Sequence, residues 1–312
     1  MVDLSVSIGS LKLANPIMPG SGTMAEGLAD IIDLDGLGAI VLKTITPDIR
    51  QGTLTPRVAE FNDATLFSIG IPSKGPDYFL NNTLPFYGRY KAPVVASVSA
   101  DTVEDFGTLA AYISAPSIAA IEANISCPNL RAHGRAFGMD IEATAGVIAA
   151  MKRATDKPVW AKLTPNVGDI AAFAKAAEQA GADAIVTGNA ILGMAVDAER
   201  MRPRLGNVIG GLTGSAVKPI LLRMVHQCAQ AVDIPIIGCG GITNGEDAVE
   251  YMLAGATAVQ MGTVNFVHPG AMPEAVGWIE GYCRRHGVER VRDLTGAMSD
   301  THAGQPKLKV TQ

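Results

Sequence analysis

The sequence predicts an α/β protein in which residues 1–312 form one domain, a closed (β/α)8 (TIM) barrel. Three observations point to this fold: eight short apolar runs recur along the chain, alanine-rich amphipathic segments separate them, and 48% of the 312 residues are hydrophobic. Strands that are apolar on both faces and alternate with helices form a parallel sheet covered by helices. Eight such units favour a barrel over a doubly wound sheet, which would also need a GxGxxG turn after an early strand.

The first predicted element is an N-terminal β-hairpin at about residues 3–15. Leu4, Val6 and Ile8 alternate along one arm, and Gly9 with Ser10 suits the turn. The eight barrel strands are then expected at Pro16–Pro19, Ala39–Thr44, Pro93–Val98, Ile118–Ile125, Pro158–Leu163, Ala184–Thr187, Ile234–Cys239 and Ala258–Met261.

Between these strands, the apolar periodicity predicts helices that pack against the sheet. Two of them end at Gly181 and Gly255, where a left-handed C-cap favours glycine. Residues 47–89, rich in Pro, Gly and Asn, are predicted to form a long substrate-binding loop, and residues 299–312 a C-terminal tail. The clearest helices are expected at Ile141–Thr155, Ile170–Ala180, Ala216–Ala231 and Glu246–Ala254.

The composition argues against several classes of protein. Lys and Arg total 25 against 30 Asp and Glu, a net charge of −5 with no basic stripe, so no nucleic-acid partner is expected. The apolar runs are shorter than the ~18 residues of a membrane span, and the N-terminus does not resemble a secretory signal. The four cysteines, none in a CxxC pair, predict a cytoplasmic protein with reduced thiols and no metal site.

In a barrel, functional residues lie at the carboxyl ends of the strands. The seventh predicted strand is followed by Gly240 and Gly241, and the eighth by Gly262 and Thr263. Backbone N–H groups that no side chain covers can bind an anion, so we predict a phosphate site here. The alternative is that these glycines only form tight turns.

Lys43 and Lys162 lie at the ends of the second and fifth predicted strands. A buried lysine needs an acidic or electron-rich partner. Because no Asp or Glu follows closely on the same strand ends, contact with a ligand is favoured over a structural ion pair. The nearby amides of Asn124, Asn129 and Asn189 suit a planar heterocycle with alternating donors and acceptors.

Cys127 is the candidate acid, base or nucleophile, at the end of the fourth predicted strand. A lone buried cysteine is more often a small hydrophobic residue than a catalyst, but the surrounding amides and lysines make catalysis an equal alternative. Cys239 lies between glycines on the same rim and is expected to pack. His133, in the loop after the fourth strand, is expected to be solvated.

Five segments resemble the dihydroorotate dehydrogenase family, in particular its class 1B catalytic subunit. They are NISCPN at 124–129, KLTPNV at 162–167, GGLTG at 210–214, GCGGI at 238–242 and MGTVNF at 261–266. The resemblance runs from about residue 3 to about residue 295 and keeps the order of the motifs. The cysteine within NISCPN is similar to the soluble class 1 enzymes.

The resemblance implies FMN-dependent oxidation of (S)-dihydroorotate to orotate in de novo pyrimidine synthesis. Cys127 would take the proton from ring C5 while hydride leaves C6 for flavin N5, with Lys162 near the N1/O2 edge. The implied substrate contacts are Lys43, Ile69, Gly70, Ile71, Asn124, Asn129 and Asn189. The implied FMN contacts are Gly20, Ser21, Lys43, Thr44, Ser97, Asn124, Lys162, Thr187, Gly214, Gly240, Gly241, Gly262 and Thr263.

The same resemblance implies a partner protein. Class 1B enzymes work with a second subunit that carries FAD and a [2Fe–2S] cluster and passes electrons to NAD+. This chain has no cysteine cluster for such a centre, so it would be the FMN half of the enzyme. A homodimer or a heterotetramer is the implied assembly.

Four positions depart from the family pattern. Phe67 stands where an asparagine is expected to hold orotate, and Ser73 replaces a second amide. Ser97 replaces a flavin-facing asparagine, and Ala190 replaces a hydroxyl residue. Two alternatives therefore stay open: a related FMN oxidoreductase acting on a different cyclic substrate, and a flavin protein that only relays electrons. For dihydroorotate, backbone N–H groups of residues 69–71 and Lys43 would have to hold the carboxylate.

Overall fold

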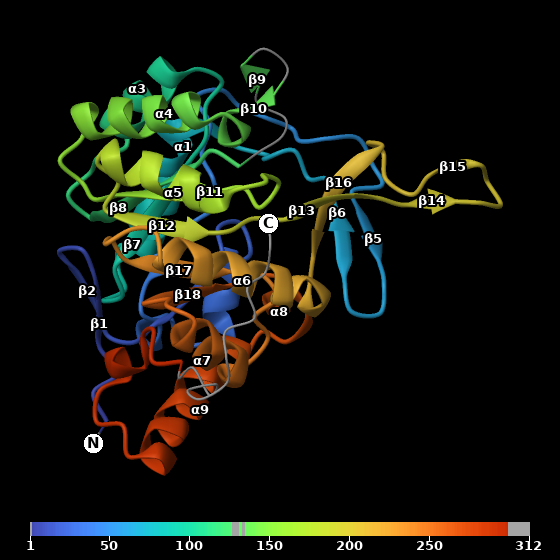
Figure 1. Cartoon of the computed structure of the whole chain (residues 1–312). Coiled ribbons are helices and arrows are strands. Elements are labelled where there is room, and N and C mark those ends of the chain that lie inside the picture. Colours follow the sequence, from blue (N-terminus) through green and yellow to red (C-terminus); the bar gives the residue numbers. More distant parts are fainter. Residues whose placement is uncertain (1, 127–130, 133–134, 299–312) are drawn as a thin grey trace, which may run out of the picture.

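The computed structural model describes residues 2–126, 131–132 and 135–298, and it contains the predicted barrel (Figure 1). Eight parallel strands lie side by side in the order β3-β18-β17-β12-β11-β8-β7-β4. The N–H of Gly38, before β4, donates to the carbonyl of Ile17 in β3 (2.8 Å), which joins the two ends of the sheet. The strands are β3 Ile17–Pro19, β4 Ile40–Val41, β7 Val94–Val98, β8 Ile118–Asn124, β11 Val159–Leu163, β12 Ala184–Thr187, β17 Ile236–Cys239 and β18 Ala258–Met261. All eight predicted strands are confirmed.

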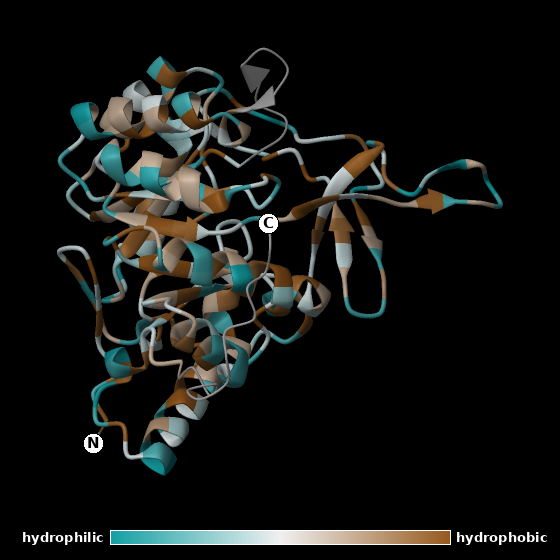
Figure 2. Ribbon diagram, viewed as in Figure 1, coloured by the Kyte–Doolittle hydropathy of each residue, from teal (hydrophilic) through white to brown (hydrophobic). Residues whose placement is uncertain are grey.

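Helices cover the outside of the barrel, with their polar faces outward (Figure 2). Four of them begin at a side chain that accepts a backbone N–H of the first turn, namely Thr102, Asp140, Asp169 and Asn244. Within the described ranges, none of the helices is both long and apolar enough to cross a bilayer. The α-helices are α1 Gly75–Tyr78, α2 Leu84–Tyr87, α3 Val103–Tyr112, α4 Ile141–Ala154, α5 Ile170–Gln179, α6 Lys218–Ala229, α7 Gly245–Leu253, α8 Val264–Val267 and α9 Ala271–His286.

The four predicted helices and both glycine C-caps are confirmed. Gly181 follows α5 with φ +97°, and Gly255 follows α7 with φ +121°. Residues other than glycine rarely adopt these backbone conformations. Short 3-10 helices lie at η1 Glu26–Asp30, η2 Leu34–Gly36, η4 Phe137–Met139, η5 Ser215–Val217 and η6 Val291–Leu294, and η3 Phe79–Thr83 is a π-helix.

The predicted N-terminal hairpin is also confirmed, as β1 (Val6–Ile8) paired with β2 (Leu11–Leu13). Val6, Ile8 and Leu13 are fully buried against the main core. A Cβ at Gly9, in the turn, would lie 3.8 Å from the carbonyl oxygen of Asp183, which directly precedes β12. The hairpin therefore covers the end of the barrel opposite the strand carboxyl ends.

The prediction that residues 47–89 form a long loop is wrong in one respect, because the segment contains a β-hairpin and, toward its end, the short helices α1, η3 and α2. Strands β5 (Val58–Glu60) and β6 (Thr65–Phe67) join β13 (Ile191–Met194) and β16 (Ile209–Thr213) in an antiparallel sheet of order β13-β16-β6-β5. The hairpin has no strong local signal, since each of its strands is three residues long with one buried residue. The hairpin is instead stabilised by the pairing of β6 with β16, which lies about 145 residues further along the chain.

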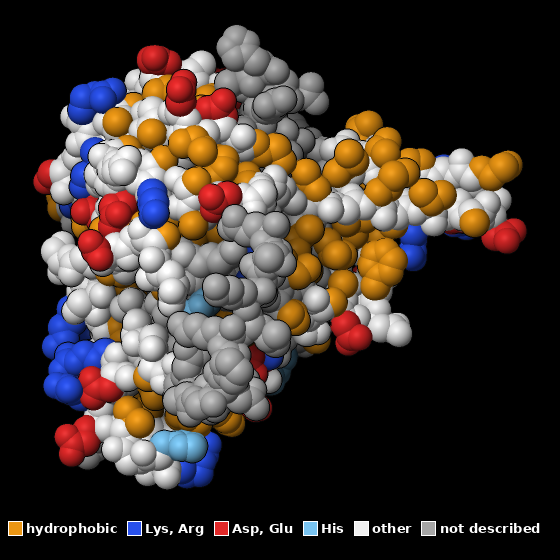
Figure 3. All heavy atoms as spheres, viewed as in Figure 1, with side chains coloured by type: hydrophobic (Ala, Val, Ile, Leu, Met, Phe, Trp, Pro, Cys, Tyr) orange, Lys and Arg blue, Asp and Glu red, His pale blue; other side chains and the backbone are white. Residues whose placement is uncertain are grey.

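This sheet forms an arm that projects from the barrel (Figure 1). The arm has a small core of its own, formed by Ala59, Leu66, Ala195 and Leu205. Its outer surface carries hydrophobic side chains, visible in Figure 3; Met194 and Met201, for example, are 55% and 89% exposed. The short strands β14 (Val196–Asp197) and β15 (Arg202–Pro203) lie at its tip, and β9 (Arg131–Ala132) pairs with β10 (Arg135–Ala136) elsewhere.

Candidate active site

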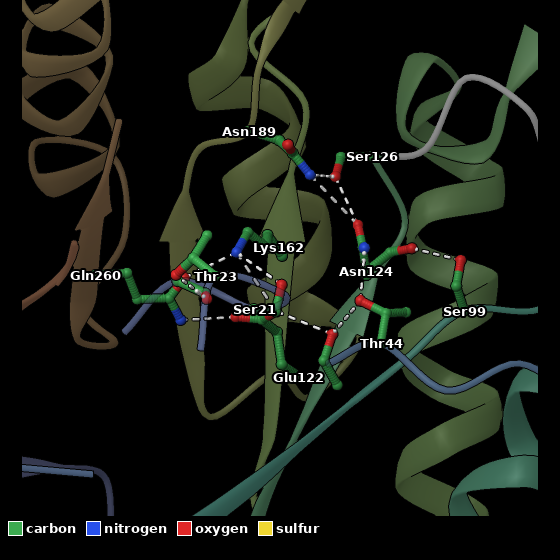
Figure 4. Close-up of polar contacts among 12 residues, drawn as sticks. Ser21, Thr23, Thr44, Ser99, Glu122, Asn124, Ser126, Lys162, Asn189 and Gln260 are labelled. Atoms are coloured by element: carbon green, nitrogen blue, oxygen red, sulfur yellow. Dashed lines mark hydrogen bonds and ion pairs between the residues drawn. The ribbon is translucent and has the colours of Figure 1, made fainter. Parts of the chain in front are cut away.

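The carboxyl ends of the barrel strands carry a continuous network of buried polar side chains (Figure 4). In parallel strands these ends lie at one edge of the sheet, so residues far apart in the sequence meet there. Ser97, Asn124 and Lys162 come from β7, β8 and β11, three neighbouring strands. The network has two parts, one centred on Lys162 and one on Asn124.

Lys162 is held by three side chains from three other segments of the chain. Its Nζ donates to Gln260 Oε1 on β18 (2.8 Å) and to Ser21 Oγ after β3 (3.3 Å), and lies 3.5 Å from Glu122 Oε1 on β8. Lys162 is 3% exposed, and both Glu122 and Gln260 are fully buried. The expectation that Lys162 lacks a structural acidic partner is therefore wrong. It makes a buried ion pair with Glu122.

Glu122 and Gln260 are members of this network that reasoning from strand ends missed. Glu122 lies two residues before Asn124 and therefore points to the same face of β8, one layer deeper in the barrel. Its partner Lys162 lies 40 positions along the chain, on the neighbouring strand. The usable signal was the polar residue within each of two otherwise apolar strands, IAAIEAN and AVQM.

The ion pair determines the protonation of Lys162. Burial lowers the pKa of this lysine, but the attraction of Glu122 and Cys239 together with the hydrogen bond to Glu122 outweighs burial, so the pKa is raised above its ordinary value. Cys239 lies close enough to interact as well: burial raises the pKa of its thiol, and the positive charge of Lys162 lowers it. Lys162 is thus a permanently charged cation at neutral pH.

The second part of the network runs through Asn124. Its Nδ2 donates to Thr44 Oγ1 (3.1 Å), Thr44 lies 3.0 Å from Ser97 Oγ, and Ser97 donates to Glu122 (3.1 Å). This chain of donors links the amide to the carboxylate of the ion pair. Thr44, Ser97 and Asn124, all predicted flavin contacts, are brought together here.

Asn189 joins the network from the other side. Its Nδ2 donates to Ser126 Oγ and to Asn124 Oδ1 (3.4 Å), and Ser126 Oγ donates to the same Oδ1 (2.7 Å). Two of the three predicted substrate amides are therefore adjacent. The third, Asn129, lies outside the described residues, as do Cys127 and His133.

Lys43 lies in a cavity of about 560 Å³ beside this network. A Cβ at Gly22 would lie 3.0 Å from Lys43 Cδ, so glycine at this position, with φ +80°, leaves room for the lysine chain. Thr44, Pro72 and Ser73 line the same cavity. The cavity therefore connects the barrel mouth with the predicted substrate loop.

The substrate loop turns sharply at Gly70 and Ile71, with φ of +78° and +47°. A positive φ is unusual for a β-branched residue and is maintained only where the surrounding structure enforces it. The carbonyl of Ile69 accepts from Thr53 N (3.0 Å), but the N–H groups of residues 69–71 find no acceptor among the described residues. Within the described chain no acceptor therefore competes with an anion for these N–H groups.

Phe67 and Ser73, two departures from the family pattern, have clear structural roles. Phe67 pairs with Gly211 of β16, and a Cβ at Gly211 would lie 3.5 Å from the ring and 2.6 Å from Ala190 Cβ. The Phe67 ring and Ala190 therefore lie on the same face of the arm, beside Gly211. Ala190 directly follows Asn189 of the network. Ser73 Oγ accepts from the N–H groups of Thr46 (3.1 Å) and Gly75 (3.2 Å), so it orders the loop.

The predicted phosphate site has the geometry of a backbone cradle. Gly240 and Gly241 have φ of +122° and +73°, and a Cβ at Gly241 would lie 2.7 Å from Lys218 N. Tyr251 donates to the carbonyl of Gly240 (2.6 Å). Because the peptide is planar and trans, this contact points the N–H of Gly241 the opposite way. Within the described chain, neither glycine N–H has an acceptor.

The opposite wall of the cradle is formed by the residues after β18. Thr263 Oγ1 lies 2.9 Å from Thr213 Oγ1, next to Gly214, and a Cβ at Gly20 would lie 3.5 Å from the Cα of Gly262. The predicted residues Gly20, Gly214, Gly262 and Thr263 are thus close to one another. A phosphate with a planar ring extending toward Lys162 suits these residues, so the site fits FMN.

Thr187 differs from the other predicted flavin contacts. Its hydroxyl donates to Cys228 Sγ on α6 (3.5 Å), so the side chain points to the helix layer, away from the mouth. Only its backbone remains available to a ligand. No group of three or more metal-ligating side chains occurs among the residues that the structure describes.

Comparison with known proteins gives one consistent match. The family model described as dihydroorotate dehydrogenase matches residues 3–277. The chain is 46% identical over 301 residues to the dihydroorotate dehydrogenase B (NAD(+)) catalytic subunit of Bacteroides fragilis, covering 96% of this chain and 99% of the relative. The subunit of the same name from Porphyromonas gingivalis is 46% identical over 306 residues, 97% and 100% of the two chains.

Proposed function

Because this chain belongs to the dihydroorotate dehydrogenase family, we propose that it oxidises (S)-dihydroorotate to orotate in pyrimidine synthesis, with FMN as its cofactor. The observation that carries the proposal is the barrel mouth, where a glycine cradle for a phosphate and the charged Lys162 lie on one rim. The family is flavin-dependent, and FMN is the flavin that the cradle supports. The related oxidoreductase with another substrate receives no support from the comparisons.

When bound, FMN would accept the hydride that leaves C6 of dihydroorotate. Lys162 would offset the negative charge that arrives with it, because a fixed cation in a water-poor site is worth more than in water. Asn124 and Asn189 would hold the pyrimidine edge. The free N–H groups of Ile69, Gly70 and Ile71 would bind the carboxylate together with Lys43.

Cys127 is the proposed base for the proton at C5. It directly follows Ser126 in the sequence, whose hydroxyl donates to Asn124 Oδ1 in the network, and the family resemblance gives this cysteine the role of base. Thiolate formation would be favoured by Lys43 and Lys162. Removal of the C5 proton and loss of hydride from C6 together form the C5–C6 double bond of orotate.

The proposal includes an assembly. The relatives are named catalytic subunits and NAD(+) enzymes, so we infer a second subunit with FAD and a [2Fe–2S] cluster that passes electrons to NAD+. Two copies of this chain, alone or with two such partners, would form a homodimer or a heterotetramer. The exposed apolar side chains of the arm suit such an interface (Figure 3). A cytoplasmic location belongs to the same proposal.

One experiment tests the proposal directly. The purified protein is mixed with dihydroorotate under anaerobic conditions while the flavin absorbance is followed, and the released cofactor is identified by mass spectrometry. Bleaching of the flavin, formation of orotate and a mass of FMN are the expected results. A protein that carries FMN but is not reduced by dihydroorotate would contradict the substrate, and one that carries no FMN would contradict the cofactor.

A further inference from the structure

Glu122 is a buried carboxylate in the interior of the barrel. Barrel interiors are usually filled by branched apolar residues, and a buried charge is costly unless it is paired and hydrogen-bonded. Glu122 meets this requirement with three donors: Gln260 Nε2 to Oε2 (2.7 Å), and Ser97 Oγ (3.1 Å) and Lys162 Nζ (3.5 Å) to Oε1. The site is therefore built around an ionised carboxylate.

The geometry also fixes the direction in which Lys162 points. An ammonium group has three protons, and here they have three acceptors. Glu122 and Gln260 bind it from the barrel interior, whereas Ser21, in the loop after β3, binds it at the mouth. The contact with Ser21 is the one that a ligand at the mouth can replace, because the two interior contacts keep Nζ in place (Figure 4).

We propose that Glu122 is a positioning residue for the redox step: its carboxylate keeps Lys162 protonated and holds the ammonium at the mouth. This inference rests on the proposed function, in which negative charge collects on the reduced flavin near Lys162. Glu122 does not itself contact the mouth. It acts through Lys162, and Gln260 fixes the second oxygen of its carboxylate.

Removal of the carboxylate charge makes a specific change. In Glu122→Gln the burial of Lys162 loses its main offset, and only the weaker attraction of Cys239 remains, while burial can lower the pKa of a lysine by several units. The titratable groups that act on Lys162 within the described chain are Glu122 of β8 and Cys239 of β17. Gln260 and Ser21, its other partners, carry no charge. Lys162 should therefore lose its proton near neutral pH in this variant.

The first measurement follows the lysine itself and needs no turnover. The protein as purified is labelled with 13C-lysine, and the signal of the Lys162 ε-carbon is assigned by its loss in Lys162→Met. In the wild type this signal should stay constant from about pH 6 to about pH 9, whereas in Glu122→Gln it should titrate within that range. A Lys162 signal that stays constant in Glu122→Gln would overturn the inference.

The second measurement is the reduction potential of the bound flavin as a function of pH. When Lys162 is neutral, reduction takes up one additional proton for two electrons, and a tenfold change in proton concentration then shifts the potential by a further ~30 mV. Glu122→Gln should show this steeper slope above the new lysine pKa, and the wild type should not. In Glu122→Gln/Lys162→Met the steeper slope should disappear.

Three variants serve as controls. Glu142→Gln removes an exposed carboxylate at the start of α4 and should leave both measurements unchanged. Glu122→Gln/Cys239→Ser should keep the new ionisation if it belongs to Lys162, and its loss would assign the titration to the thiol and overturn the inference. Glu122→Asp keeps the charge on a shorter side chain, so Lys162 should remain protonated to a higher pH than in Glu122→Gln.

The outcomes separate this inference from the proposed function. A protein without FMN, or one that dihydroorotate does not reduce, contradicts the proposed function, while the NMR titration still tests the coupling between Glu122 and Lys162. A wild type that dihydroorotate reduces, together with a Glu122→Gln variant of wild-type slope, contradicts only the role of Glu122. If Glu122→Gln does not fold, Glu122→Asp takes its place, and a Lys162 pKa no lower than in the wild type would overturn the inference.

Discussion

Phe67 of β6 lies directly opposite Gly211 of β16, and a Cβ at position 211 would be in van der Waals contact with its ring, 3.5 Å away. Ala190 borders the same space, since a Cβ at Gly211 would lie 2.6 Å from Ala190 Cβ. An aromatic ring therefore occupies the place where the family pattern has an amide for the substrate.

We expect Phe67→Asn to improve the binding of dihydroorotate. One hydrogen bond to a charged group is worth about 1.5–3 kcal/mol, or roughly one to two decades in affinity. Steady-state kinetics with dihydroorotate should show this gain mainly in KM. Phe61→Asn, at the end of the same hairpin and 45% exposed, is the matched control and should change little. No gain at position 67 would mean that the ring belongs to the pocket of a less polar substrate.

Tyr251→Phe should weaken FMN binding by about 2- to 10-fold. The variant removes the hydrogen bond to the Gly240 carbonyl, which is worth about 0.5–1.5 kcal/mol, and frees the Gly240–Gly241 peptide to rotate. Titration of the flavin-free protein with FMN, followed by flavin fluorescence, measures the change. Tyr112→Phe on α3, whose hydroxyl bonds Asp77 at the surface, should bind FMN as the wild type does. Equal affinities of the two variants for FMN would show that the Tyr251 hydroxyl does not contribute to FMN binding.

Asp247 should make the stability of the protein depend on pH in the acid range. Burial raises the pKa of this carboxyl. Hydrogen bonds from Lys218 Nζ (2.6 Å) and from Thr243 N and Oγ1 (2.7 and 2.6 Å) together lower it by more than burial raises it, so the pKa is below its ordinary value. A lowered folded-state pKa stabilises the protein above the unfolded value of about 3.8, and this contribution is lost as the pH falls through the folded value.

Asp247→Asn should therefore cost about 1–2 kcal/mol of unfolding free energy at neutral pH, a figure reduced for the partly exposed Lys218. The difference from the wild type should shrink as the pH falls below about 4. Urea unfolding at a series of pH values measures it, with the exposed Asp30→Asn as the control. A difference that is the same at pH 3 and pH 7 would show that the charge of Asp247 is not responsible.

Cys127→Ser should keep FMN but slow its reduction by dihydroorotate by about 10²–10⁴-fold, the usual contribution of a general base. Anaerobic stopped-flow spectroscopy measures the step. Cys283→Ser on α9 is a better control than Cys239→Ser, because the Cys239 thiol acts on Lys162 and Cys283 is buried against the helix layer. Reduction of the flavin at the wild-type rate in Cys127→Ser would show that this cysteine is not the base for the reaction.

The barrel could be predicted because its signal is local. A run such as VVASV in β7 is buried along its whole length, and helices such as α3 begin at a capping side chain directly before the first turn. The glycine cradle was predictable for the same reason, since Gly240 and Gly241 are neighbours in the sequence. The family resemblance then added the roles of residues that the pattern alone left open.

The residues that escaped prediction depend on pairing across the fold. Glu122 finds Lys162 on an adjacent strand and Gln260 across the barrel, and neither contact can be read from a single strand end. The β5–β6 hairpin is ordered by β16, which follows it by about 145 residues. The hydroxyl of Thr187 points to α6 because Cys228 accepts from it, although its position at a strand end suggested the mouth.

The arm and the barrel rest on separate hydrophobic cores. Ala59, Leu66, Ala195 and Leu205 support the arm, and none of them belongs to the cluster that supports the barrel. Substitutions in the core of the arm can therefore accumulate without opening the core beneath the strand that carries Lys162, whereas β16, through Leu212 and Thr213, also contacts the barrel core and the cradle. We expect that selection can alter which ring the enzyme accepts while its redox chemistry stays the same, and Phe67 is the position at which we expect such divergence first.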